Sequence, residues 1–243
     1  ARIGSKRLPQ KMILPFFQGF GILETILERL INEKLNVPIV LATSNMIEDD
    51  IIEEIGFKNN IKTFRGSEEN VLDRFIKASE KYGFTKVIRI CADNPFLDLT
   101  ALKYQLNEFR NFNIDYWAYA LSNNIPTIKT HYGFWTEGVT LSALKKIANK
   151  TTDNFFLEHV TNYIYTNPSQ FSIHFEFIKE AIEKEKNIRL TIDTEEDFRL
   201  GQKIFNQLIE LNIPFTALDI LEYIKKKPVF FEIMKNEILK NRK

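Results

Sequence analysis

The sequence predicts an α/β protein whose mostly parallel sheet carries helices on both faces. Short apolar runs of strand length alternate with helical patterns along the 243 residues, and this alternation is typical of parallel sheets. Hydrophobic residues make up 44% of the chain, which suffices to fill one large core at this length. We therefore expect residues 1–243 to form a single domain.

Five apolar runs have the length and composition of strands: Pro38–Ala42, Ile61–Phe64, Val87–Cys91, Ile114–Tyr119 and Ile188–Ile192. Apolar residues elsewhere recur at spacings of three and four, which indicates helices. These helices are Ile22–Glu33, Asp49–Ile55, Glu69–Tyr82, Thr100–Phe109, Ser142–Ala148, Asn154–Tyr165, Glu195–Glu210 and Ala217–Lys226. The acids at 195–197 follow Thr194 and are typical of a helix start, so we do not assign them to catalysis.

Two segments differ from this pattern. Residues 123–140 are less periodic and rich in Pro, Gly, His and aromatic residues, which predicts a small inserted lid rather than an element of the sheet. The tail from Lys225 onward is basic and amphipathic, which is typical of a solvated helix, with contact to a partner as the alternative. The tail and the aromatic content are compatible with a homodimer.

Composition excludes several classes of protein. The 33 Lys and Arg residues nearly balance the 32 Asp and Glu residues, so we expect no nucleic-acid or membrane partner, and any phosphate site must be local. The single cysteine, Cys91, excludes an internal disulfide framework and fits a reducing compartment. No apolar run approaches the roughly 20 residues that span a bilayer, and the start of the chain does not read as a signal peptide. We expect a cytoplasmic protein.

The opening segment ARIGSKRLPQK places four long cations around a glycine and a serine. A flexible turn there can offer backbone N–H groups while the cations reach several phosphates. The segment predicts a triphosphate cradle, with a disordered basic arm as the alternative, and its spacing fits neither GxGxxG nor GxxxxGK[ST]. The cations are Arg2, Lys6, Arg7 and Lys11, around Gly4 and Ser5.

Two aspartates stand at the ends of apolar runs, Asp93 after VIRIC and Ala92, and Asp193 after IRLTI. Ligands of open α/β sheets bind outside the carboxyl ends of the strands, so both carboxylates are expected at one site. There they could share the Mg²⁺ ions that clamp a triphosphate. The alternative for Asp93 is a cap of the turn before Asn94 and Pro95.

These segments occur in an order that resembles the cytidylyltransferase family, in its branch similar to spore coat polysaccharide biosynthesis protein F. Members read approximately ARxGSxRLPGK, VVATS, FRGSExDVLxRF, RITGDCPL, a glycine followed by EV, EHVTPYIY and TVDTPEDF. The corresponding segments here are residues 1–11, VLATS at 40–44, FRGSEENVLDRF at 64–75, RICADNPFL at 89–97, GFWTEGV at 133–139, EHVTNYIY at 158–165 and LTIDTEEDF at 190–198. The ordered set spans most of the chain, and the family is kin to the enzymes that make CMP-Kdo and CMP-sialic acid.

The resemblance implies a Rossmann-like nucleotidyltransferase fold, CTP and a sugar-type acceptor as substrates, and Mg²⁺ as cofactor. Matching residues would hold the triphosphate with Ala1, Arg2, Gly4, Ser5, Arg7 and Lys11, and the base and ribose with Ala42, Thr43, Ser44, Arg65, Ser67, Asp73 and Arg74. Asp93 and Asp193 would bind the metal and, with Arg2 and Lys11, carry catalysis, whereas Glu137, Glu158 and His159 would face the acceptor. It also implies a strand of roughly six to eight residues ahead of Ala1.

Several of these residues have a structural alternative. Thr43 and Ser44 can cap the following helix, and Asp73 and Arg74 can form an exposed pair on a helix. A lone histidine on a helix, such as His159, is more often structural than catalytic.

The chain departs from the family pattern at three positions, with Gln10 and Ala92 in place of glycine and Asn94 in place of cysteine. Alanine is tolerated where φ is negative, but Gln10 is strained if its φ is positive.

The sequence leaves three other functions open. One is a nucleotidyltransferase with another nucleotide or a non-sugar acceptor, such as an alditol phosphate, because fold kinship fixes neither choice. Another is a glycosyltransferase that binds a finished nucleotide sugar, although Asp93-Asn94-Pro95 is not a DxD motif. The third is a catalytically silent binding protein, which the changes at Gln10 and Ala92 favour and both aspartates oppose.

Overall fold

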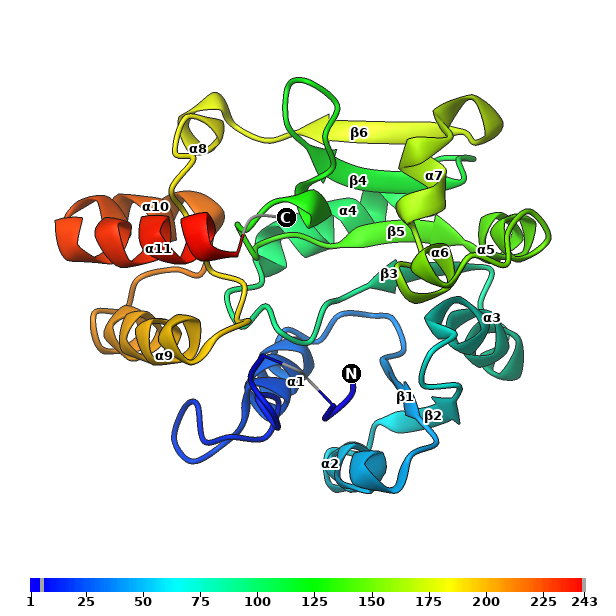
Figure 1. Ribbon diagram of the computed structural model, residues 1–243, viewed down its shortest axis with the longest axis horizontal. Coiled ribbons are helices and arrows are strands. Elements are labelled where there is room, and N and C mark those ends of the chain that lie inside the picture. The colour runs from blue at the N-terminus through cyan, green and yellow to red at the C-terminus, as the bar shows by residue number, and fades with distance from the viewer. Residues whose placement is uncertain (5–6, 242–243) are drawn as a thin grey trace.

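Two separate sheets run through the computed structural model, which describes residues 1–4 and 7–241 (Figure 1). In the smaller sheet, β1 (Val40–Ser44) pairs in parallel with β2 (Lys62–Gly66). The larger sheet has the order β3-β5-β4-β6, made of Lys86–Arg89, Glu137–Thr140, Tyr116–Ala120 and Ile173–Phe177. β6 is parallel to β4, whereas β5 is antiparallel to both of its neighbours.

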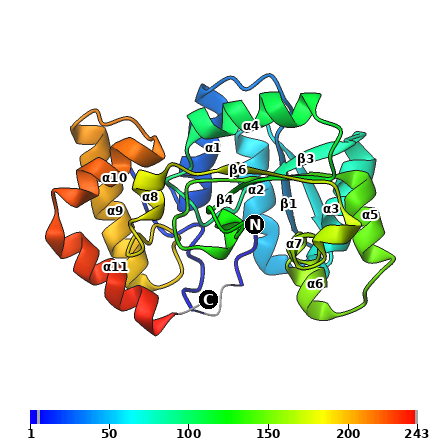
Figure 2. The same cartoon turned by 90° about the horizontal axis from the view of Figure 1, so that it is seen from above.

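Helices cover both faces of the larger sheet, as Figure 2 shows with α4 on one side and α6 and α7 on the other. α4 (Leu99–Asn111) shares a buried cluster with Trp117 of β4. α5 (Leu141–Ala148) and α7 (Asn162–Thr166) share another with Tyr116. These two aromatic neighbours serve opposite faces because successive side chains of a strand alternate. The predicted α/β class, with helices on both faces, is confirmed.

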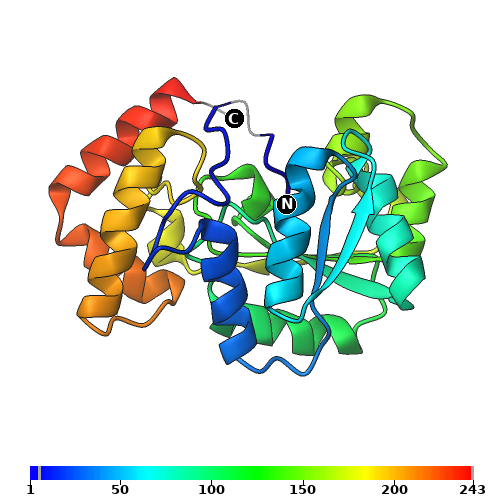
Figure 3. The ribbon, with the colours of Figure 1, turned by 90° about the horizontal axis from the view of Figure 1, so that it is seen from below.

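The remaining long helices flank this arrangement. Figure 3 shows α9 (Glu195–Glu210), α10 (Ala217–Lys225) and α11 (Pro228–Lys240) grouped at one side of the molecule. α1 (Ile22–Asn32) and α2 (Asp50–Lys58) lie next to this group, nearer the middle of the view. α3 (Val71–Tyr82) lies at the other side with α5. Short helices complete the chain: α6 (Asn154–Glu158), α8 (Glu180–Glu183), η1 (Ile47–Asp49), η2 (Thr127–Lys129) and η3 (Pro168–Gln170).

Local chemistry explains where the long helices begin and end. The Asn70 side chain accepts from the Asp73 N–H at the start of α3, and Gly83 ends that helix with φ of 72°, which suits glycine. Thr194 and Asp197 form a reciprocal capping box at the start of α9. The capping prediction for this helix is therefore confirmed.

The predicted strand at 188–192 is wrong. This segment forms no strand, and its backbone bonds to loops: Leu190 N–H donates to the His131 carbonyl at 2.8 Å, and Ile192 N–H donates to the Asp93 carbonyl at 3.0 Å. Its apolar side chains are buried in the main core, which explains the strand-like composition. Because its partners are two different loops, no ladder forms.

The predicted helix at 154–165 is interrupted. α6 ends at Glu158 and α7 begins at Asn162. Between them the Thr161 side chain is turned into the core, where its hydroxyl donates to Glu137 at 3.0 Å. A buried polar contact thus outweighs the local helical pattern.

The expectation that residues 123–140 stand outside the sheet is wrong for their last part. Glu137–Thr140 is β5, which lies between β3 and β4. Tyr132 and Phe134 are buried in the main core, and Gly133, with φ of 74°, packs against the Leu190 backbone. The aromatic residues that suggested a lid are core residues.

The tail is a helix, but its inner face packs on the rest of the chain. Phe230 and Met234 of α11 are 4% and 1% exposed, and α11 contacts α9 and α10. The expectation of a solvated tail is therefore wrong for this face. Within the described residues, no helix is both long and apolar enough to cross a membrane.

An apolar slot separates the two sheets. In the described part of the chain, β1 pairs only with β2 and β3 only with β5, so each strand has one edge without a neighbouring strand. Val40 and Leu41 of β1 line the same cavity as Val87 and Ile88 of β3, above Leu27 of α1. This slot continues into the polar cleft described next.

Candidate nucleotide and metal site

The polar cleft lies at the carboxyl end of β3, between the first residues of the chain, α6 and the segment that precedes α9. Together with the apolar slot it encloses about 1410 Å³. Its polar wall brings together residues that are far apart in sequence: Ala1, Arg2, Gly4, Arg7, Lys11, Arg74, Asp93, Glu158, His159 and Asp193. Most residues of the predicted cradle, metal pair and acceptor site therefore share one cleft.

Lys11 links the two predicted metal ligands. Its Nζ lies 3.1 Å from Asp93 Oδ2 and 3.4 Å from Asp193 Oδ1, and it donates to the Ile192 carbonyl at 2.5 Å. The side chain of Lys11 is 8% exposed, so this cation is held between two carboxylates in a largely water-excluded position. The backbone hydrogen bond from Ile192 to Asp93 keeps the segment of Asp193 beside the segment of Asp93. Of these two segments, only that of Asp93 follows a strand, β3.

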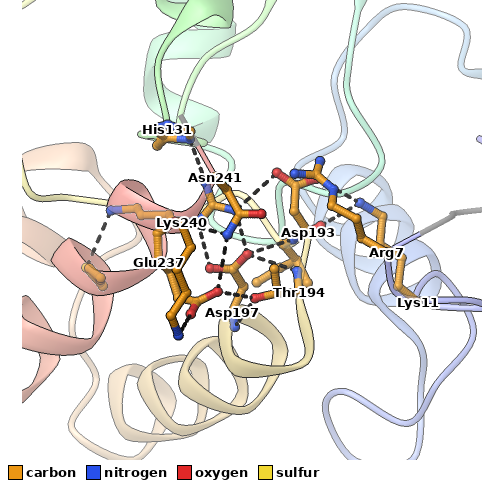
Figure 4. Close-up of polar contacts among 12 residues, drawn as sticks. Arg7, Lys11, His131, Asp193, Thr194, Asp197, Glu237, Lys240 and Asn241 are labelled. Atoms are coloured by element: carbon orange, nitrogen blue, oxygen red, sulfur yellow. Dashed lines mark hydrogen bonds and ion pairs between the residues drawn. The ribbon is translucent and has the colours of Figure 1, made fainter. Parts of the chain in front are cut away.

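Asp193 is surrounded by further cations, as Figure 4 shows. Arg7 Nη2 lies 2.8 Å from its Oδ1, and Arg189 Nη2 lies 3.3 Å from its Oδ2. Arg189 is buried and donates to both oxygens of Asp197 at 2.7 Å. Asp197 Oδ2 also accepts the Asp193 N–H at 3.0 Å. The first turn of α9 thus sets the backbone and the side chain of Asp193.

The C-terminal helix supports the same loop. Glu237 of α11 accepts from the Thr194 hydroxyl at 2.8 Å and from Lys240 Nζ at 2.8 Å (Figure 4). His131 Nδ1 accepts from Arg189 Nη1 at 2.6 Å. Sequence reasoning missed Arg189, Glu237 and His131, because each acts through another side chain that lies beside it only in the fold: Arg189 through Asp193, Glu237 through Thr194 and His131 through Arg189. The buried arginine in an apolar run was the one available signal.

The N-terminal residues are fixed by a second buried carboxylate. Asp49 is 2% exposed, and it accepts from the Ile3 N–H at 2.7 Å, the Thr43 hydroxyl at 2.9 Å and the Ser44 hydroxyl at 2.5 Å. Burial raises the pKa of Asp49, but these hydrogen bonds outweigh it and leave the pKa below its ordinary value. In the structure, Thr43 and Ser44 hold the side chain of Asp49, which binds the cradle backbone. Neither η1 nor α2 has a side-chain cap, so the alternative that Thr43 and Ser44 cap the following helix is wrong.

The cradle itself is partly described. The Ala1 nitrogen donates to the Ala42 carbonyl at 3.0 Å, and Arg2 pairs with Glu158 at 2.9 Å. Gly4 lines the cleft. Ser5, which we assigned to the triphosphate, lies outside the described residues. The cradle thus connects β1 to α6 across the opening of the cleft.

Arg74 differs from the other residues assigned to the base and ribose. It is 3% exposed, its Nη2 reaches only the Glu68 carbonyl at 3.4 Å, and its Nε is buried with no hydrogen-bond partner among the described residues. Burial, followed by the nearby charge of Arg2, lowers the pKa of Arg74. A buried guanidinium with unused donors on the wall of a cleft indicates a place for a polar or anionic ligand.

Three further residues assigned to the base and ribose line a smaller pocket of about 560 Å³: Arg65, Ser67 and Asp73. Arg65 is engaged by Asp50 and Glu53, Ser67 caps the turn before α3, and Asp73 pairs with Lys77 at 2.8 Å. Arg65, Ser67 and Asp73 do not line the cleft that holds Arg74, but the smaller pocket adjoins it, because Glu68 and Glu69 line both. Asp73 and Arg74 do not form an exposed pair, because Arg74 is buried.

The three residues assigned to the acceptor do not share one environment. Glu158 pairs with Arg2 on the wall of the cleft, and His159 ends α6 with its ring against Phe155 at 4.8 Å. Glu137 is 2% exposed, and its carboxylate accepts from Arg89 at 2.7 Å, from Thr161 and from the Tyr116 hydroxyl. These contacts occupy both carboxylate oxygens of Glu137 in the core. We therefore no longer assign Glu137 to direct contact with the acceptor, and assign it to holding Arg89 in place.

The two aspartates fit a divalent cation that a substrate helps to bind. No cluster of three or more His, Cys, Asp or Glu side chains suited to a metal occurs among the residues that the structure describes. Mg²⁺ is usually held by one or two carboxylates together with substrate phosphates. The buried ammonium of Lys11 between Asp93 and Asp193 shows that these carboxylates jointly attract positive charge. The donor set therefore fits a metal that arrives with a phosphate ligand.

Comparison with known proteins agrees with this arrangement. A family model described as cytidylyltransferase matches residues 1–235. The chain belongs to the cytidylyltransferase family. The predicted resemblance and the Rossmann-like nucleotidyltransferase fold are thereby confirmed.

Two curated proteins are similar to this chain over most of its length. An uncharacterised protein of Methanocaldococcus jannaschii is 34% identical over 236 residues, which cover 97% of this chain and 92% of that protein. Spore coat polysaccharide biosynthesis protein SpsF of Bacillus subtilis is 31% identical over 233 residues, with coverage of 94% and 92%. A solved cytidylyltransferase structure from Leptospira borgpetersenii has 30% identity, a TM-score of 0.82, and coverage of 95% of this chain and 93% of that one.

Proposed function

We propose that this member of the cytidylyltransferase family transfers CMP from CTP to a sugar or sugar acid, with release of pyrophosphate. The observation that carries the proposal is the position of Lys11 between the carboxylates of Asp93 and Asp193, in a cleft bordered by Arg2, Arg7 and Arg74. Membership of the family supports the cytidylyl group. The name of the Bacillus subtilis relative, spore coat polysaccharide biosynthesis protein, supports a role in the assembly of a surface polysaccharide or other glycan.

The cations of the cleft divide into two kinds. The Arg2–Glu158 pair is exposed on both sides, at 38% and 48%, and exposed pairs contribute only about 0–1 kcal/mol, so phosphate oxygens can replace Glu158 at little cost in free energy. Arg7 is 52% exposed, whereas its partner Asp193 is 10% exposed. Asp193 keeps Lys11 and Arg189 as partners when Arg7 turns to a phosphate. Lys11 is enclosed and stays beside the aspartates. Arg2, Arg7 and Lys11 would together stabilise the departing pyrophosphate.

The nucleotide end of the cleft would use Arg74. Its unpaired Nε and its burial leave a guanidinium whose charge-assisted hydrogen bonds would be strong in a site without water. Asp49, through Thr43, Ser44 and Ile3, would keep the cradle backbone in place for the triphosphate. These residues would thus orient CTP so that its α-phosphorus faces the acceptor.

In the reaction, an acceptor hydroxyl would attack the α-phosphorus in line as pyrophosphate leaves, so positioning and charge neutralisation supply most of the catalysis. Asp93 and Asp193 would hold Mg²⁺, which offsets negative charge on the phosphates. A carboxylate in the cleft could accept the proton of the attacking hydroxyl.

The test is pyrophosphate release by the purified protein with Mg²⁺, each of four nucleoside triphosphates, and a panel of sugars, sugar acids, sugar phosphates and alditol phosphates. We expect release with CTP and one sugar-type acceptor. Release with another nucleotide or with an alditol phosphate would replace the substrates proposed here. Glycosyl transfer from a nucleotide sugar, or CTP binding without turnover for any pair, would contradict the proposal.

A further inference from the structure

Arg89 lies at the carboxyl end of β3 and directly opposite Glu137 of β5 in the strand register. Opposed residues of an antiparallel pair project from the same face, and Arg89 Nη1 donates to Glu137 Oε2 at 2.7 Å. Glu137 is itself held by Tyr116 and Thr161. One nitrogen of the Arg89 guanidinium is therefore anchored on a carboxylate that cannot easily move.

The other two nitrogens of Arg89 are differently placed. Nε and Nη2 have no hydrogen-bond partner within the described ranges 1–4 and 7–241, and neither is among the buried atoms without a partner. The side chain is 18% exposed, and Arg89 lines the cleft. Its unused donors are thus accessible from the cleft.

The position of these donors separates them from the predicted triphosphate cradle. Arg89 precedes Asp93 by four residues along one wall of the cleft. Glu137, which anchors it, is bonded to Thr161 in the turn that follows His159. Arg89 therefore lies toward α6, the side that carries Glu158 and His159, whereas Lys11 and Arg7 lie toward Asp193.

The electrostatics of Arg89 are those of a permanently charged group. Burial disfavours its charge, but the neighbouring Cys91 and the Glu137 carboxylate outweigh burial and keep the pKa of Arg89 above its ordinary value. A planar guanidinium anchored by one nitrogen still presents a fork of donors that matches the two oxygens of a carboxylate or a phosphate. If the ion pair with Glu137 were its only role, no edge of the guanidinium would need to reach the cleft.

We propose that Arg89 is a specificity residue that binds a compact oxyanion of the acceptor, either a carboxylate or a phosphate, and so selects anionic acceptors over neutral ones. The inference rests on the proposed function, because it assumes that the cleft receives an acceptor beside the nucleotide. Glu137, Tyr116 and Thr161 act as positioning residues that hold Arg89 in this orientation.

The experiment measures binding, so that it does not depend on turnover. Sugar acids and sugar phosphates, each paired with its neutral counterpart lacking the acid group, are titrated into the CTP-saturated protein by calorimetry. Two variants are compared. The double variant Arg89→Gln/Glu137→Gln removes the guanidinium together with the carboxylate that pairs with it, so that no unpaired charge stays buried. The second variant is Arg89→Lys. Arg199→Gln, which removes an exposed guanidinium of α9, is the matched control.

We expect the wild-type protein and Arg199→Gln to bind at least one anionic probe tenfold or more tighter than its neutral counterpart, a factor that corresponds to about 1.4 kcal/mol. The double variant should lose this preference while its Kd for CTP changes less than about twofold. Arg89→Lys should retain only part of the preference, because an ammonium lacks the planar fork. Whether carboxylates or phosphates show the preference identifies the source of the oxyanion.

An unchanged preference in the double variant would overturn the proposal, and so would the absence of any preference, or of any binding by the anionic probes, in the wild-type protein. Failure of the proposed function has a different signature. It would appear as no pyrophosphate release or no CTP binding by the wild-type protein, whatever the behaviour of Arg89.

Discussion

At the scale of single residues, the site depends on charges that are paired within the protein. Lys11 compensates two carboxylates, Arg189 compensates Asp197 and Asp193, and Arg89 compensates Glu137. Removing one partner of such a buried pair leaves an uncompensated charge, which is strongly unfavourable. Substitutions that keep shape and remove charge are therefore the informative ones.

Asp93→Asn tests the predicted metal pair, because it preserves the shape of the side chain and removes half of the negative charge around Lys11. We expect turnover to fall by at least ~10²-fold, as loss of one electrostatic contact to a transition state does. Pyrophosphate release at saturating Mg²⁺ measures it. Glu195→Gln, which alters a side chain that is 69% exposed on α9, should keep the wild-type rate. Wild-type turnover by Asp93→Asn would remove Asp93 from the metal site.

Gln10 occupies a backbone position that suits glycine. The φ of Gln10 is 57°, so this departure from the family pattern strains the backbone, as expected for a positive φ. The φ of Ala92 is not positive, so alanine is tolerated there. Gln10→Gly should stabilise the protein by about 1 kcal/mol, because a left-handed residue with a Cβ is unfavourable by that order. Thermal unfolding checks it, with Gln10→Ala as a control that keeps the Cβ. Equal unfolding temperatures of the Gly and Ala variants would contradict the strain.

At the scale of elements, α11 and the slot between the sheets have the clearest consequences. The buried carboxylate of Glu237 connects α11 to the cap of α9 through Thr194. Burial raises the pKa of Glu237, but hydrogen bonds from Lys240 and Thr194 outweigh it, so that the pKa is lowered from 4.5 in the folded protein. A carboxyl with a lowered pKa stabilises the fold above its unfolded pKa and loses this contribution as the pH falls through its folded pKa.

Glu237→Gln should therefore destabilise the protein by about 1.5–3 kcal/mol at pH 7, the range for hydrogen bonds to a charged group. The difference from the wild-type protein should shrink as the pH falls below the unfolded value of 4.5. Urea unfolding between pH 7 and pH 3 measures both effects. Glu232→Gln, on an exposed position of the same helix, should show neither, and a pH-independent difference for Glu237→Gln would refute the charge-based explanation.

The slot between β1 and β3 is lined by apolar side chains of both strands, and each strand has one edge without a neighbouring strand in the described part of the chain. We propose that an apolar segment of about six residues, added before Ala1, would pair with both strand edges and cover Leu27, Val40 and Val87. It should raise Tm by more than about 5 °C relative to a Gly/Ser extension of equal length. Equal Tm values for the two extensions would show that the slot does not accept a strand.

At the scale of the whole molecule, the cleft joins parts that the backbone leaves separate. The cradle, the smaller sheet with α3, the end of β3 and the start of α9 all contribute to it, and the two sheets share no strand pairing within the described residues. A ligand in this cleft would contact elements from both sides of the slot. Binding of the ligand should therefore raise the free energy of global unfolding and not only the stability of one local segment.

CTP at 100 times its Kd should stabilise the protein by about 2.7 kcal/mol if it binds only the folded state. Arg74→Gln should reduce this stabilisation at the same CTP concentration, since it removes the buried guanidinium from the cleft wall. Without CTP it should not lower Tm, because that guanidinium is incompletely paired. Arg199→Gln serves as the control. A full CTP effect in Arg74→Gln would exclude Arg74 from the nucleotide site.

The sequence by itself determined the α/β class, most helix positions and the two aspartates, because apolar period, capping residues and motif order are local properties. It could not show that 188–192 bonds to loops instead of forming a strand, that Glu137–Thr140 lies inside the sheet, or that Thr161 breaks a helix. Those outcomes depend on which segments meet in space. Tertiary structure alone decided that Lys11 joins Asp93 to Asp193, that Asp49 engages Thr43, and that Arg89 and Arg74 keep unused donors at the cleft. The physical reason is that burial and partner distance, which govern charge and hydrogen bonding, are set by contacts between residues far apart in sequence.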